Sequence, residues 1–361
     1  MSSDFGKNIR YTVFGQSHSE AIGIVIDGLP PGETVDPYEI RRFMSRRAPA
    51  GKDYATKRRE DDDFQILSGV LNDKTCGAPL CAVILNKDIQ SKSYEDIKDL
   101  LRPGHADYTA HLKYKGFADY RGGGHFSGRL TAPLCFAGGL VKGILEKRGI
   151  VIGAHILSLG KVQEKPFDPV QVSADDLKDP GRYPFPTSSI GVGDTMQAQI
   201  GLIAKKLNSL GGVIEAGVVG LPPGLGEPMF DGVENLLAKH LFGIPAVKGV
   251  EFGDGFGAAS LRGSEHNDAF CLKDGMIQTK TNHAGGILGG ITTGMPLILR
   301  VAVKPTPSIG TDQETVDLST SAETTVTVAG RHDPCIVPRA VPVVESVIAM
   351  TLLDLLLDAK G

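Results

Sequence analysis

The sequence predicts a single α+β domain, residues 1–361, in which antiparallel strands pack against long apolar helices. Runs rich in β-branched residues alternate with capped helical segments, and no Pro- or Ser-rich linker divides the chain. The pentapeptide GLPPG also occurs twice, at 28–32 and 220–224, each time after a strand-like run and before a helical segment that an aspartate opens, Asp36 or Asp231. This short echo, which chance can also produce, favours two related, intertwined halves at roughly 1–150 and 190–361.

The helices are predicted from their caps and their periodicity. Asp36 opens the first helix, in which Ile40, Phe43 and Met44 share one face. Pro103 ends the second, because a residue that precedes proline avoids helical backbone angles. The expected helices lie within 38–47, 93–101, 131–149, 194–212, 230–241 and 343–359.

The strands are predicted from β-branched and aromatic runs that end in glycine or other turn residues. They are expected within 11–14, 22–26, 211–220, 246–252, 296–303 and 324–330. The first two are separated by a short polar link, so they read as a hairpin. His18 lies in that link, where a histidine is either a catalytic group presented by a rigid sheet or a solvated turn residue.

The composition is that of an ordinary globular protein, with 41% hydrophobic residues and a formal net charge of −4. Acidic and basic residues are mixed along the chain, which argues against a nucleic-acid-binding stripe. No apolar signal core and no run of about 18 apolar residues is evident, so we expect a cytoplasmic protein without a membrane span. The cysteines form no metal-binding or CxxC pattern and are expected to be reduced and mostly buried; they are Cys76, Cys81, Cys135, Cys271 and Cys335.

Four polar clusters in the predicted loops indicate an enzyme for an anionic substrate. They contain Arg46, Arg47, Lys52, Arg58 and Arg59; Arg102 and His105; Ser127 and Arg129; and Arg331 and Asp333. Each cluster taken alone also suits a solvated surface. Together they suit phosphate and carboxylate groups, because guanidinium groups bind both with paired hydrogen bonds. Histidines in nearby turns can protonate a departing phosphate at cellular pH.

Two glycine-rich segments, 282–294 and 304–310, flank one predicted strand. Neither has the spacing of a dinucleotide-binding or P-loop motif, and both are equally compatible with structural turns. The residues alone therefore name no cofactor.

Long motifs along the chain resemble those of the chorismate synthases. They are GQSHSEAIGIVIDGLPPG, ILSGV, RPGHADYT, RGGGHFSGR, GLGEPMFDGVE, AVKGVEFGDGF, NHAGGILGGI, KPTPSI and GRHDPCIVPRAVPVVES, which occur in the family order from residue 6 to about 357. The resemblance implies a lyase that eliminates phosphate from 5-enolpyruvylshikimate 3-phosphate to give chorismate and requires reduced FMN without net redox change. It also implies a β-α-β sandwich with helices between two antiparallel sheets, an internal duplication and a homotetramer.

The resemblance further implies roles for individual residues. His18 and His105 match the family histidines that supply protons, and Asp333 matches the acid that assists proton removal at the flavin. The substrate-binding matches are Ser17, Arg47, Arg102, Arg129 and Arg331. The flavin-binding matches are His125, Phe126, Ser127, Pro245, Ala246, Gly289, Lys304, Pro305, Thr306, Pro307, Ser308 and Arg331.

The chain departs from the family pattern around two of these residues. The usual GESHG is GQSHS here, so Gln16 replaces an acid and Ser19 replaces a glycine. The usual RSSARET is HFSGRLT, which changes residues 125, 126, 128 and 130. An arginine usually found near 51–53 is missing, and Lys52 is the nearest cation. The departures motivate an alternative, a non-catalytic flavin- or phosphometabolite-binding homologue. The sequence also leaves open whether NADPH reduces the flavin on this chain or a separate flavin reductase supplies it, with the latter favoured.

Overall fold

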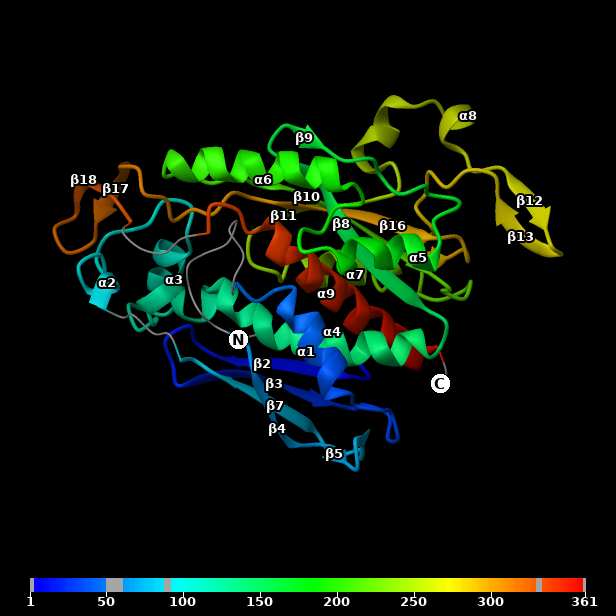
Figure 1. The fold of residues 1–361 in the computed structure, drawn as a ribbon, viewed down its shortest axis with the longest axis horizontal. Coiled ribbons are helices and arrows are strands. Elements are labelled where there is room, and N and C mark those ends of the chain that lie inside the picture. Colours follow the sequence, from blue (N-terminus) through cyan, green and yellow to red (C-terminus); the bar gives the residue numbers. More distant parts are fainter. Residues whose placement is uncertain (1–2, 50–60, 88–91, 329–332, 360–361) are drawn as a thin grey trace.

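Two antiparallel five-stranded sheets enclose a layer of helices in the computed structural model, which describes residues 3–49, 61–87, 92–328 and 333–359 (Figure 1). The first sheet has the order β1-β2-β3-β7-β4, formed by Asp4–Phe5, Arg10–Gly15, Ala21–Asp27, Leu80–Leu85 and Phe64–Ser68. The second has the order β11-β16-β10-β8-β9, formed by Val247–Phe252, Leu297–Val303, Gly212–Val219, Val151–Leu159 and Val162–Gln163. The predicted sandwich is confirmed.

The helices between the sheets are α1 (Pro37–Ser45), α4 (Thr131–Glu146), α7 (Val233–Leu241) and α9 (Val337–Asp358). The α4 and α9 helices pack against each other along the middle of the layer, and their amino-terminal ends lie at the same end of the molecule (Figure 1). The α6 helix (Ile190–Lys205) lies outside the second sheet (Figure 1). Each GLPPG loop follows a strand, β3 or β10, and precedes a helix, α1 or α7; the boundaries of the two related halves stay a prediction.

The α9 helix carries apolar side chains on every face because it is the central element of the core. Most of its side chains are buried between the two sheets, from Val337 to Leu355. By length and composition alone the helix could cross a membrane, so the expectation that no such apolar run exists was wrong. Its burial within the fold explains the composition, because a helix that packs on every face needs no polar side.

Several predicted boundaries shift for identifiable reasons. The Asp36 side chain caps α1 by accepting hydrogen bonds from the backbone N–H groups of Tyr38 and Glu39. The α7 helix begins after Gly232, which means that Asp231 is not its cap. The second predicted helix shortens to α2 (Lys92–Glu95), and the strand predicted at 324–330 ends at Val326.

The smaller elements surround this framework. The remaining strands are β5 (Val70–Leu71), β6 (Lys74–Thr75), β12 (Phe270–Lys273), β13 (Met276–Thr279), β14 (Ile287–Leu288), β15 (Ile291–Thr292), β17 (Gln313–Asp317) and β18 (Ala322–Val326). The remaining helices are α3 (Asp107–Lys113), α5 (Ala174–Lys178), α8 (Gly263–His266) and the 3₁₀ segments Arg121–Phe126, Gly128–Leu130, Asp179–Arg182 and Gly255–Ser260. Figure 1 shows the β12–β13 hairpin projecting from the body of the molecule.

All five cysteines are free thiols, as expected, but the prediction that most are buried is wrong. Cys135 and Cys335 are buried, and burial raises the pKa of each thiol to about 12. Cys76 is exposed, whereas Cys81 and Cys271 are half-buried.

Candidate active site

A cavity of about 1460 Å³ lies at the end of the helical layer where α4 and α9 begin. Segments far apart in the sequence line it, among them the β2–β3 turn, the residues after α1, residues 102–106, residues 125–131, the loop 242–247 and the segment after β16. The first turns of α9 complete the wall. The fold therefore brings at least one described member of each of the four polar clusters to this cavity, namely Arg47, Arg102 and His105, Ser127 and Arg129, and Asp333.

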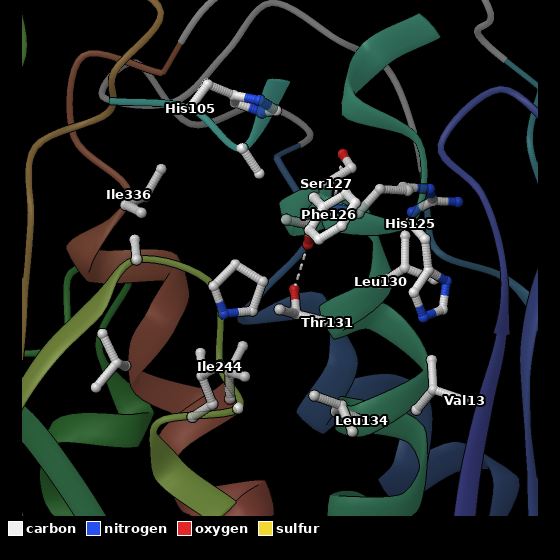
Figure 2. Close-up of a pocket in the computed structure, with 18 of the residues that line it drawn as sticks. Val13, His105, His125, Phe126, Ser127, Leu130, Thr131, Leu134, Ile244 and Ile336 are labelled. Carbon is white, nitrogen blue, oxygen red and sulfur yellow. Dashed lines mark hydrogen bonds between the residues drawn. The ribbon is translucent and has the colours of Figure 1, made fainter. Parts of the chain in front are cut away.

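The cavity has an apolar part and a polar part. Figure 2 shows Val13, Leu134 and Ile244 in its lower half, His105, Ser127 and Ile336 in its upper half, and Thr131 between them. The cavity is wide enough to hold a flat aromatic group against the apolar side chains and an anionic molecule beside the polar ones.

Arg47 and Arg129 share one buried carboxylate. The Nη1 atoms of both guanidinium groups donate to Asp62, while Arg47 Nε donates to Thr131 Oγ1 at 2.9 Å. All three charged side chains are buried, and Arg47 and Arg129 line the cavity. Burial alone raises the pKa of Asp62, but the two guanidinium groups lower it by more. Two cations are thus fixed by one anion, which leaves net positive charge beside the cavity.

The β2–β3 turn is tied to this arginine pair through Asn86. Its Nδ2 donates to the carbonyl oxygens of Gln16 and Ser19, and its Oδ1 accepts from Arg129 Nε at 3.0 Å. The Ser19 hydroxyl accepts from Gln16 N–H and donates to the carbonyls of Gln16 and Ala21. The serine that replaces the usual glycine therefore stabilises the turn. Gln16 lines the cavity, whereas His18 does not.

Asp107 holds both Arg102 and His105. Arg102 donates to its carboxylate through Nε (2.8 Å), Nη2 (2.7 Å) and the backbone N–H (3.0 Å), and His105 Nδ1 donates at 2.8 Å. The arginine and the histidine both line the cavity. Burial raises the pKa of Asp107, but the hydrogen bonds from His105 and Arg102 outweigh it and hold that pKa well below its usual range.

The triple glycine allows both histidines to lie against the backbone. A Cβ on Gly122 would lie 2.1 Å from Cε1 of His18, and one on Gly123 would lie 2.9 Å from Nε2 of His105. Both glycines also have positive φ angles, 59° and 81°. His18 is only 5% exposed and packs edge-on against Tyr94, so it is not the solvated turn residue of the alternative interpretation.

The segments matched to flavin binding lie mostly at this cavity. His125 Nδ1 donates to the Gly15 carbonyl, Ala246 adopts an unusual positive φ of 74°, and Lys304 Nζ donates to the Gly104 carbonyl. The matched residues that line the cavity are His125, Phe126, Ser127, Pro245, Ala246, Lys304, Thr306, Pro307 and Ser308. The structure does not bring Ser17, Gly289 or Pro305 to the lining, and Lys52, Arg58, Arg59 and Arg331 lie outside the described residues.

Asp333 lines the cavity beside the start of α9. Arg339 donates to its carboxylate from Nη1 at 2.6 Å and to the Arg47 carbonyl from Nε at 2.8 Å. One guanidinium group therefore joins the acid to the segment that carries the first arginine cluster.

The sequence interpretation missed the residues that hold the site together, namely Asp62, Asn86, Asp107 and Arg339. Asp107 follows His105 by two positions in RPGHAD, and this spacing was an available signal. Asp62 lies in a run of three aspartates, so nothing local distinguishes the one that is buried.

The arrangement can bind a multiply charged anion and can move a proton next to it. Arg47, Arg102 and Arg129 are anchored donors, and His105 is a titratable group fixed by a carboxylate. Among the described residues, no group of three or more His, Cys, Asp or Glu side chains is placed to hold a metal ion.

Comparisons with known proteins agree on one family. The family model for chorismate synthase matches residues 9–357. The chorismate synthase of Korarchaeum cryptofilum is 48% identical over 350 residues, which cover 97% of this chain and 96% of the relative. That of Thermococcus kodakarensis is 47% identical over 356 residues, covering 99% and 98%. A solved structure described as a crystal structure of chorismate synthase superposes with a TM-score of 0.77 at 26% identity, covering 99% of this chain and 94% of that one.

Proposed function

The chain belongs to the chorismate synthase family, and from this premise we propose that its large cavity binds 5-enolpyruvylshikimate 3-phosphate and reduced FMN and releases phosphate and chorismate. The observation that carries the proposal is the convergence of three anchored arginines and a carboxylate-bound histidine on one cavity. The alternative, a non-catalytic binding homologue, is not favoured, because curated relatives at 43–48% identity are chorismate synthases over nearly the whole chain.

The substrate carries a phosphate and two carboxylates, and the cavity offers fixed cations for these groups. Arg47 and Arg129 are held by Asp62, and Arg102 is held by Asp107, so little side-chain entropy is lost when they bind an anion. Lys304, whose Nζ donates to the Gly104 carbonyl, adds a further cation to the lining. Arg331 is proposed for the same role from its sequence motif alone.

The elimination breaks a C–O bond and a C–H bond. The phosphate leaves with the electron pair of the C–O bond, the electrons of the C–H bond form one double bond of the product, and the ring double bond already present shifts to the carbon that loses the phosphate. His105 is proposed to donate a proton to the departing phosphate, which is a poor leaving group as a dianion. Asp333, which Arg339 orients, is proposed to assist removal of the carbon-bound proton. His18, which lies behind the lining against Gly122, is proposed to hold a proton at the flavin side of the site.

The cavity fits a flavin. The side chains of Val13, Leu134 and Ile244 form an apolar wall for a ring system. Thr306 Oγ1 is buried in the lining and has no hydrogen-bond partner among the described residues, so it is available to a polar group of a ligand. Gly128 has open space where a Cβ would stand, which allows a ligand to approach its backbone. When bound, reduced FMN supplies electron density to the reacting ring and is recovered unchanged.

We further propose that the protein is a cytoplasmic homotetramer. The β12–β13 hairpin exposes Phe270, Leu272, Met276 and Ile277, an apolar surface that suits contact with a second copy.

The experiment that tests the proposed function is an anaerobic assay of phosphate release from the substrate with dithionite-reduced FMN. We expect turnover with reduced FMN and none with oxidised FMN. Failure of phosphate release with reduced flavin would overturn the proposal. NADPH in place of dithionite then distinguishes a chain that reduces its own flavin from one that depends on a separate reductase.

A further inference from the structure

We propose that Asp107 is a positioning residue that fixes the proton-bearing form of His105 and the direction of Arg102, although it does not itself contact the substrate. The proposal rests on the proposed function, in which His105 is the proton donor. No motif match assigned a role to Asp107.

The contacts single out one carboxylate. Oδ1 accepts from His105 Nδ1 at 2.8 Å and from Arg102 Nη2 at 2.7 Å, while Oδ2 accepts from Arg102 Nε at 2.8 Å and from the Arg102 backbone N–H at 3.0 Å. Arg102 Nη2 also lies 3.2 Å from His105 Nδ1. Arg102 and His105 therefore both donate to the carboxylate of Asp107, which lies in the first turn of α3.

Asp107 faces away from the large cavity. Arg102 and His105 line both the large cavity and a second cavity of about 370 Å³, whereas Asp107 lines only the second. The second cavity is also bordered by Asp99 and Asp119. A carboxylate on this side stays out of contact with a substrate in the large cavity, yet it touches Arg102 and His105, the two groups proposed to bind that substrate.

The position of Asp107 determines which ring nitrogen of His105 is protonated in the neutral imidazole. Asp107 is ionised at neutral pH, because the hydrogen bonds from His105 and Arg102 hold its pKa far below the usual range despite burial. An ionised carboxylate only accepts hydrogen bonds, so Nδ1 must carry a proton. Nε2 is then the nitrogen that exchanges a proton with the reacting group, and the anion at Nδ1 stabilises the imidazolium that forms.

The test compares Asp107→Asn with the control Asp99→Asn. Asp99 is a second carboxylate of the same cavity, and it is joined to Leu318 through its backbone carbonyl. The tautomer of His105 is read from imidazole ¹⁵N chemical shifts of the substrate-free protein, with the signals assigned by their loss in His105→Gln. Turnover and KM are measured anaerobically with reduced FMN, and urea unfolding reports on stability.

We expect Asp107→Asn to lose the uniform Nδ1–H form and to lower turnover by about 10²–10⁴-fold. KM should rise less, and Asp99→Asn should change neither readout. Asp107→Glu, which restores a carboxylate, should recover part of the turnover. An unchanged tautomer in Asp107→Asn would overturn this inference whether or not the protein is active. A changed tautomer with normal turnover would instead overturn the proton-donor role of His105.

Discussion

Gly122 is the residue on which the placement of His18 depends most directly. Its φ is 59°, and an added Cβ would lie 2.1 Å from His18 Cε1 and 2.8 Å from Ser17 Oγ. We predict that Gly122→Ala lowers turnover by about 10²-fold, the cost of a displacement of about 1 Å at a reacting group. The control is Gly143→Ala on α4, where nothing lies within 4 Å, and it should keep full turnover. A folded Gly122→Ala with normal turnover would show that the position of His18 is unimportant for the reaction.

Arg129 is expected to contribute to substrate binding through a guanidinium group that is already fixed. Arg129→Ala should weaken substrate binding by about 1–3 kcal/mol, the range for a hydrogen bond to a charged group. Titration of substrate into the reduced-flavin complex measures this change. Arg42→Ala, which removes an exposed arginine paired with Glu39, should leave binding unaltered. Equal affinity of the Arg129 variant and wild type would remove this residue from the site.

Residues whose role depends on local chemistry could be predicted from the sequence, and those whose role depends on distant partners could not. His105 and Arg102 occur in a turn that contains proline and glycine and leads into α3, and functional side chains are common in such loops. By contrast, Asp62 acquires its role only because the fold places Arg47 and Arg129, 15 and 67 positions away, on either side of it.

At the scale of elements, three helices are joined by one buried ion cluster. Arg46 at the end of α1 donates to both oxygens of Glu345 on α9, at 2.9 and 2.6 Å, and Lys142 of α4 donates to the same carboxylate. Burial opposes ionisation of Glu345, but Arg46 and Lys142 outweigh it and lower its pKa from 4.5 to about 2. The cluster therefore fixes α1, which Arg47 follows by two residues, against the centre of the core.

The lowered pKa of Glu345 makes a prediction about stability and pH. A carboxyl group whose pKa is lower in the folded state stabilises that state above its unfolded pKa, and this contribution is lost as the pH falls from about 4.5 to about 2. The difference between these pKa values corresponds to about 3 kcal/mol. Urea unfolding should therefore show that the free energy of unfolding of Glu345→Gln is lower than that of wild type. The difference should be largest at pH 6–7, on the order of 3–5 kcal/mol, and should become smaller below about pH 4.5.

The control for this experiment is Glu39→Gln, which alters an exposed ion pair on α1. Its unfolding free energy should stay within about 0.5 kcal/mol of wild type at every pH. If the difference in unfolding free energy between wild type and Glu345→Gln does not change with pH, the charge of this residue does not stabilise the helical layer.

Element types were predictable where the pattern is local, and element ends were not. The strand at 211–220 and the helix at 131–149 appear almost as expected, as β10 and α4, because β-branched runs and an apolar helical face identify them. Asp231 is not the cap of α7, because the residue at the cap position is Gly232, one residue later than the sequence predicts. The first residue of α7 depends on how the helix packs in the fold, which the local sequence does not indicate.

At the scale of the whole molecule, the projecting β12–β13 hairpin predicts self-association. Leu272 and Ile277 face each other across the hairpin and are 77% and 70% exposed. The double variant Leu272→Asp and Ile277→Asp should shift the mass measured by light scattering towards smaller species, because charges at an interface core are costly. Lys273→Glu in the same hairpin should keep the wild-type mass. A double variant of unchanged mass would place the interface elsewhere.

The central claim is that this cavity eliminates phosphate from its substrate without net oxidation or reduction. The most direct test is an anaerobic single-turnover experiment with stoichiometric reduced FMN, in which phosphate, chorismate and the flavin spectrum are followed together in wild type and His105→Ala. We predict equal amounts of phosphate and chorismate and fully reduced flavin at the end, with the rate lowered by about 10²–10⁴-fold in the variant. Flavin that ends oxidised, phosphate without chorismate, or a variant as fast as wild type would contradict the account.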